Sequence, residues 1–330
     1  MTSVKFPRRT FLQLAALHLA AGAGVLPALS RIARAQAYPA RPIRFIVPSV
    51  AGGGLDFVAR LIADHVSRAV AQPIIIENKA GGGGLLGIEA AAKSPPDGYT
   101  ALICNDSLVS APHIVKFNVD YVWSLLPVIQ TVRTGQVVVV HPSLGVRSIG
   151  ELIDAAKRRP GMAYASSVAQ QHFLMEWIAQ AAGIKLEHIP YRGAGQSVND
   201  LIAGHVMIGA AGPTAIIPHH RTGTLRIIAQ SSQTRARSLA DVPTLEEAGL
   251  KGIVLELWQG AFVPARTPAD IIIRLNTEIR RAVLDPMIGQ KLLEASYEPV
   301  GGSAEQLAAL VREDSDKYAR LARELNIRAD

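Results

Sequence analysis

The residues best suited to chemistry are three glycines that follow a short apolar run near the start of the chain. Residues 43–47 form this run, and its β-branched side chains predict a buried strand. Gly52, Gly53 and Gly54 come next, and Asp56 precedes a segment with helical apolar spacing. A helix start exposes unpaired N–H groups and carries partial positive charge. The order strand, glycine turn, helix therefore predicts a receptor for an anion such as a carboxylate.

The same stretch has a purely structural alternative. Asp56 can act only as the cap of the helix, and the glycines can act only as a tight turn. The glycine runs match neither a dinucleotide-binding turn nor a phosphate loop, because no Gly-Lys-Ser/Thr sequence occurs. Both the anion site and the simple turn stay open from this stretch alone.

Other chemistries lack the residue spacing that they need. No Gly-x-Ser-x-Gly elbow for a hydrolase is present, and no His-Glu-x-x-His motif for zinc. The single cysteine, Cys104, lies in the apolar run 100–104, so we interpret it as a core residue. We expect no catalytic residue, no metal and no cofactor.

The first 37 residues predict an export signal. A basic start, an apolar stretch over residues 11–29 and a small-x-small sequence at 35–37 predict cleavage near Ala37 and a periplasmic mature protein. Arg8-Arg9 resembles a twin-arginine signal, but Gln13 stands where lysine is usual, so general secretion is the alternative route. A membrane anchor is disfavoured by the prolines and glycines of this segment.

Most of the net charge of +7 belongs to that signal. It carries five of the 34 Lys and Arg residues and no acid, so 29 basic residues face 27 acids in the remainder. Without the signal, the chain has little excess positive charge to attract nucleic acid or a membrane surface. We therefore expect no nucleic-acid partner. The remaining length of about 290 residues suits two lobes better than one core.

Alternating strands and helices organise the rest of the chain. In the first part, strands at 43–47, 74–77 and 100–104 alternate with helices, which predicts a parallel sheet. Ligands bind beyond the carboxyl ends of such strands. A second run of this kind follows two strands that could cross between lobes, at 128–132 and 136–140. Residues 255–263 predict the return crossing.

We therefore expect an α/β fold with two lobes and a hinge of crossing strands. The first lobe is discontinuous and comprises residues 38–132 and 258–330, while the second comprises residues 133–257. The helices at the end of the chain are expected to cover the first lobe.

Six segments in order resemble those of the substrate-binding proteins of tripartite tricarboxylate transporters, also called Bug receptors. Together they span essentially all of the mature chain: residues 43–48 with 51–60, 77–78 with 81–84, 96–100, 189–195, 241–249 and 298–301. The resemblance implies a monomeric periplasmic binding protein of type II that closes like a Venus flytrap around a small carboxylate. It also implies delivery to integral membrane subunits of a transporter.

The resemblance also implies where the ligand lies. In the family, the loop matching residues 49–56 wraps one carboxylate, so main-chain N–H groups there would bind it and Asp56 would cap the helix. Residues from other loops would complete the site. The full set of expected ligand-binding residues is Ser49, Ala51, Gly52, Gly53, Asp56, Asn105, Ser107, Ser166, Ser167, Gln170, His172 and Arg192.

Departures from the family pattern bear on the ligand. The loop before His172 is about two residues shorter than usual, and residues 206–213 lack the usual acidic residue. Asp106 would repel a second carboxylate unless it is turned away. We therefore expect a mono- or dicarboxylate with an apolar or aromatic remainder. The alternatives are a receptor that senses a ligand for a signalling partner, or a periplasmic hydrolase.

Overall fold

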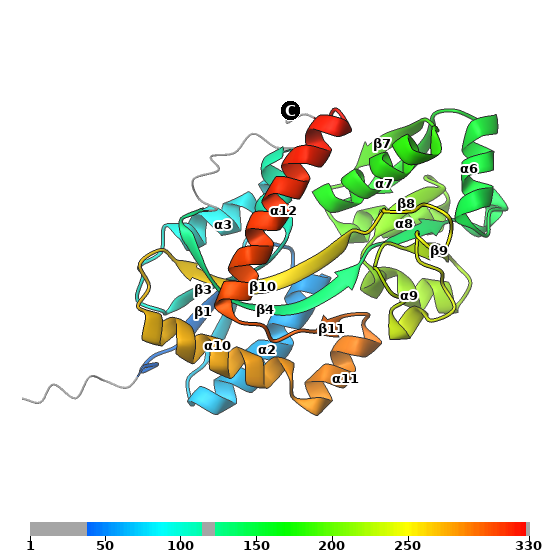
Figure 1. Ribbon diagram of the computed structural model, residues 1–330. Coiled ribbons are helices and arrows are strands. Elements are labelled where there is room, and N and C mark those ends of the chain that lie inside the picture. The colour runs from blue at the N-terminus through cyan, green and yellow to red at the C-terminus, as the bar shows by residue number, and fades with distance from the viewer. Residues whose placement is uncertain (1–37, 114–122, 328–330) are drawn as a thin grey trace, which may run out of the picture. The chain divides into compact units, whose positions relative to one another are not determined.

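Two β-sheets flanked by helices make up this computed structural model, which describes residues 38–113 and 123–327 (Figure 1). Residues from Arg41 onward belong to one compact unit. The predicted export signal, residues 1–37, lies outside the described residues. Among the residues described, no helix is both long and apolar enough to cross a membrane.

The first sheet has six strands in the order β11-β4-β10-β3-β1-β2. β1 pairs in parallel with β2 and β3, as the alternation of strands and helices predicts. β10 is antiparallel to both β3 and β4, so the sheet is mixed. Its strands are β1 (Ile43–Val47), β2 (Ile74–Asn78), β3 (Thr100–Asn105), β4 (Leu125–Gly135), β10 (Glu256–Pro264) and β11 (Glu298–Pro299).

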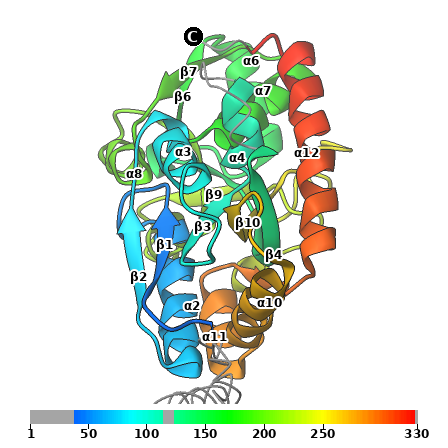
Figure 2. The same ribbon diagram turned by 90° about the vertical axis from the view of Figure 1, so that its left-hand side faces the viewer.

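Helices that follow the first strands pack on this sheet. α2 (Gly54–Val70) buries Val58, Ile62 and Val66 along one face, at the spacing expected of an amphipathic helix. It ends where Ala71 adopts a left-handed backbone conformation. Two further helices of this part are α3 (Leu85–Ala92) and α4 (Ser107–Ser110). Figure 2 shows β1, β2 and β3 side by side with α2 and α3.

The second sheet has five strands in the order β7-β6-β8-β5-β9. β6 is parallel to β7 and β8, whereas β5 is antiparallel to β8 and β9. Its strands are β5 (Val137–Val140), β6 (Met162–Ser166), β7 (Leu186–Pro190), β8 (Ile208–Ala211) and β9 (Arg226–Gln230). Its helices are α6 (Ile149–Arg158), α7 (Ala169–Ala182), α8 (Ala194–Ala203) and α9 (Pro213–Arg221).

The chain passes from the first sheet to the second at one residue, Gln136, which separates β4 from β5. A Cβ atom on Gly135 would lie 2.7 Å from the backbone nitrogen of Ser232, so glycine lets the outgoing and returning segments pack closely. Every residue of β10 pairs with a residue of β4. Residues 255–263, predicted as a return crossing, therefore lie almost entirely within the first sheet. The division into lobes with the boundaries given above stays a prediction.

Three helices close the chain and pack against the first sheet, as expected. α10 (Ala269–Val283) contacts β4 and α2, and α12 (Ala304–Glu324) runs alongside β4 (Figure 1). Between them lies α11 (Pro286–Glu294), which contacts β11. One apolar core contains residues from both sheets, including Leu102 on the first and Val138 on the second.

Candidate functional site

Asp56 organises the loop that joins β1 to α2. Its side chain is 2% exposed, and its Oδ2 accepts hydrogen bonds from Gly52 N and Arg60 Nε, both at 2.8 Å. Its Oδ1 accepts a hydrogen bond from Asn78 Nδ2 at 3.0 Å. Burial raises the pKa of Asp56, but the hydrogen bonds from Arg60, Gly52 and Asn78 outweigh burial and hold it below its usual range. Asp56 is thus a charged brace for this loop.

These contacts correct two expectations about the loop. Gly53, and not Asp56, is the N-cap residue of α2, and no side chain caps the helix. The N–H of Gly52 is engaged by Asp56, because that carboxylate reaches back over the turn. Within the described part of the chain, the N–H groups of Ala51 and Gly53 donate to no protein group. Of the three main-chain donors expected here, those of Ala51 and Gly53 therefore remain for an anion.

The first turn of α2 lies against Tyr297 from the end of the chain. A Cβ atom on Gly54 would lie 2.1 Å from the Tyr297 hydroxyl and 3.9 Å from Thr214 Oγ1. Thr214 lies in the first turn of α9, which packs on the second sheet, and donates a hydrogen bond to the carbonyl of Ala295 at 2.9 Å. Burial raises the pKa of Tyr297, against the effect of hydrogen bonds with Thr214 and Gln259. The starts of α2 and α9 therefore meet at one buried phenol.

Loops from the other parallel strands converge on the same edge of the first sheet. Gly84 has a φ of +100°, and a Cβ atom there would lie 3.3 Å from the carbonyl oxygen of Pro48 and 3.6 Å from Ser107 Oγ. Asn105 Oδ1 accepts hydrogen bonds from Ser107 N at 3.3 Å and from Ser107 Oγ at 2.5 Å. The structure thus brings Asn105 and Ser107 close to the β1–α2 loop, as expected, and pairs their side chains with each other.

On the second sheet, the expected serines already have protein partners. Ser166 Oγ lies 2.7 Å from His188 Nε2. Ser167 donates from its backbone N at 2.7 Å and from Oγ at 3.1 Å to Gln171 Oε1. Gln171 Nε2 lies 3.4 Å from Gln136 Oε1, so this network reaches the segment that joins the sheets.

His172 belongs to a stack of aromatic rings. Its ring centroid lies 4.0 Å from that of His188, and its Nδ1 lies 2.6 Å from the Tyr164 hydroxyl. The same hydroxyl donates a hydrogen bond to Glu176 Oε1 at 2.7 Å. Burial, and next the charge of His172, lower the pKa of His188 to about 4 despite Glu176. The pKa of His172 is also lowered by burial. Both rings are therefore neutral at pH 7.

Asp106 is fully buried and bridges elements of the two sheets. Its Oδ1 accepts a hydrogen bond from Gln170 Nε2 at 2.8 Å, and its Oδ2 accepts one from the Tyr318 hydroxyl at 2.5 Å. Asp106 directly follows β3, Gln170 lies in the first turn of α7, and Tyr318 lies on α12. The carboxyl group is thus turned into the protein, which resolves the question of its repulsion toward a ligand.

Comparison with known proteins places the chain in a family. The sequence model of one protein family, the tripartite tricarboxylate transporter family receptor, matches residues 58–327 of this chain. The chain belongs to this receptor family. Protein BugT of Bordetella pertussis is 33% identical to this chain, called the receptor from here on. The match extends over 296 residues, which cover 88% of this chain and 91% of BugT.

Solved structures agree with this assignment. An R. palustris protein solved with adipate has a TM-score of 0.85 and 28% identity to the receptor, covering 89% of this chain and all of that one. The periplasmic binding protein BugD has a TM-score of 0.81 and 26% identity, with the same coverage. The receptor therefore has the expected α/β periplasmic binding protein fold, and the family is one of solute receptors that work with a membrane transporter.

The receptor is a binding protein and not an enzyme, so the hydrolase alternative is wrong. The hydrogen bond between Ser166 and His188 is accordingly structural. Burial raises the pKa of the Cys104 thiol well above its usual value, so Cys104 is a core residue as predicted. No group of three metal-ligating side chains occurs among the described residues.

Arg192 has a different environment from the paired side chains of α7. It is exposed, and it follows β7 directly before Gly193, the N-cap residue of α8. In the part of the chain that the structure describes, its guanidinium forms no ion pair or hydrogen bond. A free guanidinium at the carboxyl end of a strand is available to a carboxylate.

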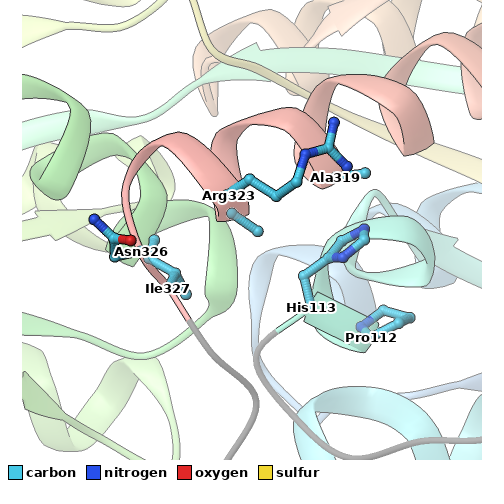
Figure 3. A pocket seen from close by; sticks show the side chains of 7 residues that line it. Pro112, His113, Ala319, Arg323, Asn326 and Ile327 are labelled. Carbon is cyan, nitrogen blue, oxygen red and sulfur yellow. The ribbon is translucent and has the colours of Figure 1, made fainter.

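Two cavities in the receptor lie away from these residues. One of about 500 Å³ lies between Ala111–His113 and the last turns of α12, where His113 and Arg323 line it (Figure 3). The other, of about 520 Å³, lies between the paired strands β4 and β10 and α12. Trp258 on β10 lines this second cavity, and its Nε1 donates to Asp314 Oδ2 on α12 at 2.7 Å. The ring therefore packs between β10 and α12.

Sequence reasoning missed several residues that shape the site. Gln171 and His188 hold the serine loop, while Thr214 and Tyr297 hold the start of α2. Thr214 follows Gly212-Pro213 at a helix start, which is a local signal that could have identified it. Tyr297 comes from far along the chain and carries no local signal.

Proposed function

We propose that the receptor binds a small carboxylate between the β1–α2 loop and the loops of the second sheet. The observation that carries this proposal is the pair of free N–H groups, on Ala51 and Gly53, at the start of a 17-residue helix. Main-chain N–H groups and the helix dipole both favour negative charge at this position. The adipate in a similar R. palustris structure supports a carboxylate as the ligand class.

The other expected residues fall into two groups, those that would bind the carboxylate and those that would form a wall beside the rest of the ligand. Ser49 and the free amides would bind the carboxylate on the first sheet, and Arg192 would add the only unpaired cation among the expected residues. Ser166, Ser167 and His172 are engaged with protein partners, so we propose that they shape the wall of the site. A single carboxylate would then be bound strongly, with an apolar or aromatic remainder packed against that wall.

We further propose that the mature chain is periplasmic and delivers its ligand to the membrane subunits of a tripartite transporter. The family supports this partner. Native mass spectrometry of protein freshly purified from the periplasm tests location, cleavage near Ala37 and ligand retention in one measurement. We expect a mass that matches residues 38–330 and a bound organic acid. An intact leader peptide would contradict the export proposal.

A thermal-shift screen tests the ligand class. Adipate, benzoate, phenylacetate and citrate are compared with the neutral amides of the same acids. We expect stabilisation by mono- or dicarboxylates and none by their amides, because the free N–H groups need an anionic acceptor. Stabilisation by citrate alone, or equal stabilisation by the amides, would contradict the proposed ligand.

A further inference from the structure

One buried atom in the contact between the two sheets has no partner. Gln170 is fully buried, and its Nε2 donates to Asp106, yet its Oε1 accepts no hydrogen bond from any described residue. An unpaired buried acceptor costs free energy, so such an atom needs an explanation. Gln170 lies in the first turn of α7, just after Ser167 and Val168, and its hydrogen bond to Asp106 joins α7 to the residue that follows β3.

We propose that Asp106 is a positioning residue whose protonation decides which end of the Gln170 carboxamide it holds, and so which end is left for a carboxylate that enters between the two sheets. The protonated carboxyl group donates its hydrogen to Gln170 Oε1 and so turns the Nε2 donors toward a bound carboxylate. The ionised carboxylate accepts from Nε2, as in this structure, and leaves Oε1 buried without a partner. The inference rests on the proposed function, because it names the group that the ligand would meet.

The shape of the amide makes this exchange possible. The two ends of a carboxamide are nearly the same size, but one is an acceptor and the other carries two donors. An acceptor repels a carboxylate, whereas a donor binds it. Tyr318 can donate to the second oxygen of Asp106 in either state, so its contact is kept. Binding of a carboxylate is therefore coupled to uptake of a proton by Asp106.

The surroundings of Asp106 favour the protonated state. Burial raises the pKa of Asp106 to about 8, and Asp314 on α12 adds to this effect. Tyr318 and Lys317 on α12 and Gln170 on α7 act in the opposite direction. Cys104 on β3 is a further titratable neighbour, and burial raises the pKa of its thiol well above the usual value, so it stays neutral.

Thermal unfolding of the ligand-free protein between pH 6 and pH 9 tests the protonation step. An acid whose pKa is higher in the folded than in the unfolded state loses stability as the pH rises between the two values. We expect the melting temperature of the wild type to fall by about 5–10 °C over this range. Asp106→Asn mimics the neutral acid and should flatten the profile, whereas Asp64→Asn, at an exposed site, should leave it unchanged. Parallel profiles for wild type and Asp106→Asn would overturn the proposal.

Side-chain amide NMR of protein labelled with ¹⁵N-glutamine tests the second step by observing the Gln170 carboxamide of the wild type directly. The Gln170 signals are assigned by their loss in Gln170→Leu. We expect them to shift as the pH rises through about 8 in the wild type, and to stay fixed in Asp106→Asn. Gln170 signals that do not change between pH 6 and pH 9 in the wild type would refute the proposal. Because both tests use ligand-free protein, their failure leaves the proposed carboxylate function untouched.

Discussion

The β1–α2 loop and the β6–α7 loop both follow parallel strands and both precede a helix, but they present different groups. In the first, a buried carboxylate braces the turn and leaves main-chain N–H groups of Ala51 and Gly53 free. In the second, the side chains of Ser166, Ser167 and His172 are all engaged with other side chains. In the proposed function, the first loop is the donor site and the second is the wall beside it.

In this proposal, one fold keeps recognition of the ligand's charge apart from recognition of its shape. Backbone donors do not depend on which side chains surround them, so a glycine loop can bind any carboxylate. A wall of paired side chains determines which remainder fits beside it, and each of its members is fixed by a partner. The ligand class would then be set by the first sheet, and the ligand's identity by the second.

The largest expected effect comes from filling the space next to the donor site. Gly54→Ala should destabilise the protein by about 2 kcal/mol, because its Cβ would overlap the Tyr297 hydroxyl. Urea denaturation measures the change. Gly53→Ala is the control, since a Cβ there meets only Val50 O at 3.6 Å. Adding Tyr297→Phe should restore part of the lost stability. A Gly54→Ala protein as stable as the wild type would show that Gly54 does not pack closely against the Tyr297 hydroxyl.

The strand, turn and helix start of the β1–α2 loop were predictable because their signals are local. The apolar run, the three glycines and the helix start are contiguous in the sequence. The role of Asp56 was mistaken because a carboxylate at the start of a helix can bond either the helix or the preceding turn. The arrangement around Ser166 was not predictable, because its partner His188 is 22 residues away. The positions of Tyr297 and Tyr318 depend on helices from the opposite end of the chain.

An effect of similar size tests the brace that Asp56 provides. Asp56→Asn should cost about 2 kcal/mol at pH 7, because it removes a buried charge that accepts three hydrogen bonds. The pKa of Asp56 is depressed, so this contribution is present above its usual value of 3.8 and is lost as the pH falls below it. Asp64→Asn is a matched control, since Asp64 pairs with Arg68 at the same spacing but at an exposed site. Equal losses from both variants would contradict the brace.

A smaller effect concerns the wall. The pKa of His188 is depressed from 6.5 to about 4, so the wild type should lose roughly 1–2 kcal/mol as the pH falls between these values. His188→Gln can still bond Ser166 but cannot be protonated, and it should flatten the profile. Melting temperatures from pH 7 to pH 4 measure the difference. A variant with the same pH dependence as the wild type would show that the stacked rings do not titrate as argued.

The smallest effect on stability is expected at Arg192. Arg192→Gln should leave the unfolding free energy within about 0.5 kcal/mol, because the guanidinium is exposed and unpaired. It should weaken carboxylate binding several-fold and reduce the salt dependence of binding, whereas Arg192→Lys should recover part of the affinity. Calorimetric titrations at two salt concentrations give both quantities. Unchanged affinity in Arg192→Gln would remove this residue from the site.

The central claim is that a main-chain donor on the first sheet binds the carboxylate. Gly53 has a φ of −77°, which suits proline, so Gly53→Pro removes one N–H group without changing the backbone, and Gly53→Ala keeps that group. Both variants are titrated calorimetrically with the carboxylate that stabilises the wild type most in the screen. We predict that Gly53→Pro binds at least about tenfold more weakly while Gly53→Ala binds like the wild type. Equal affinity in Gly53→Pro and Gly53→Ala would contradict the claim.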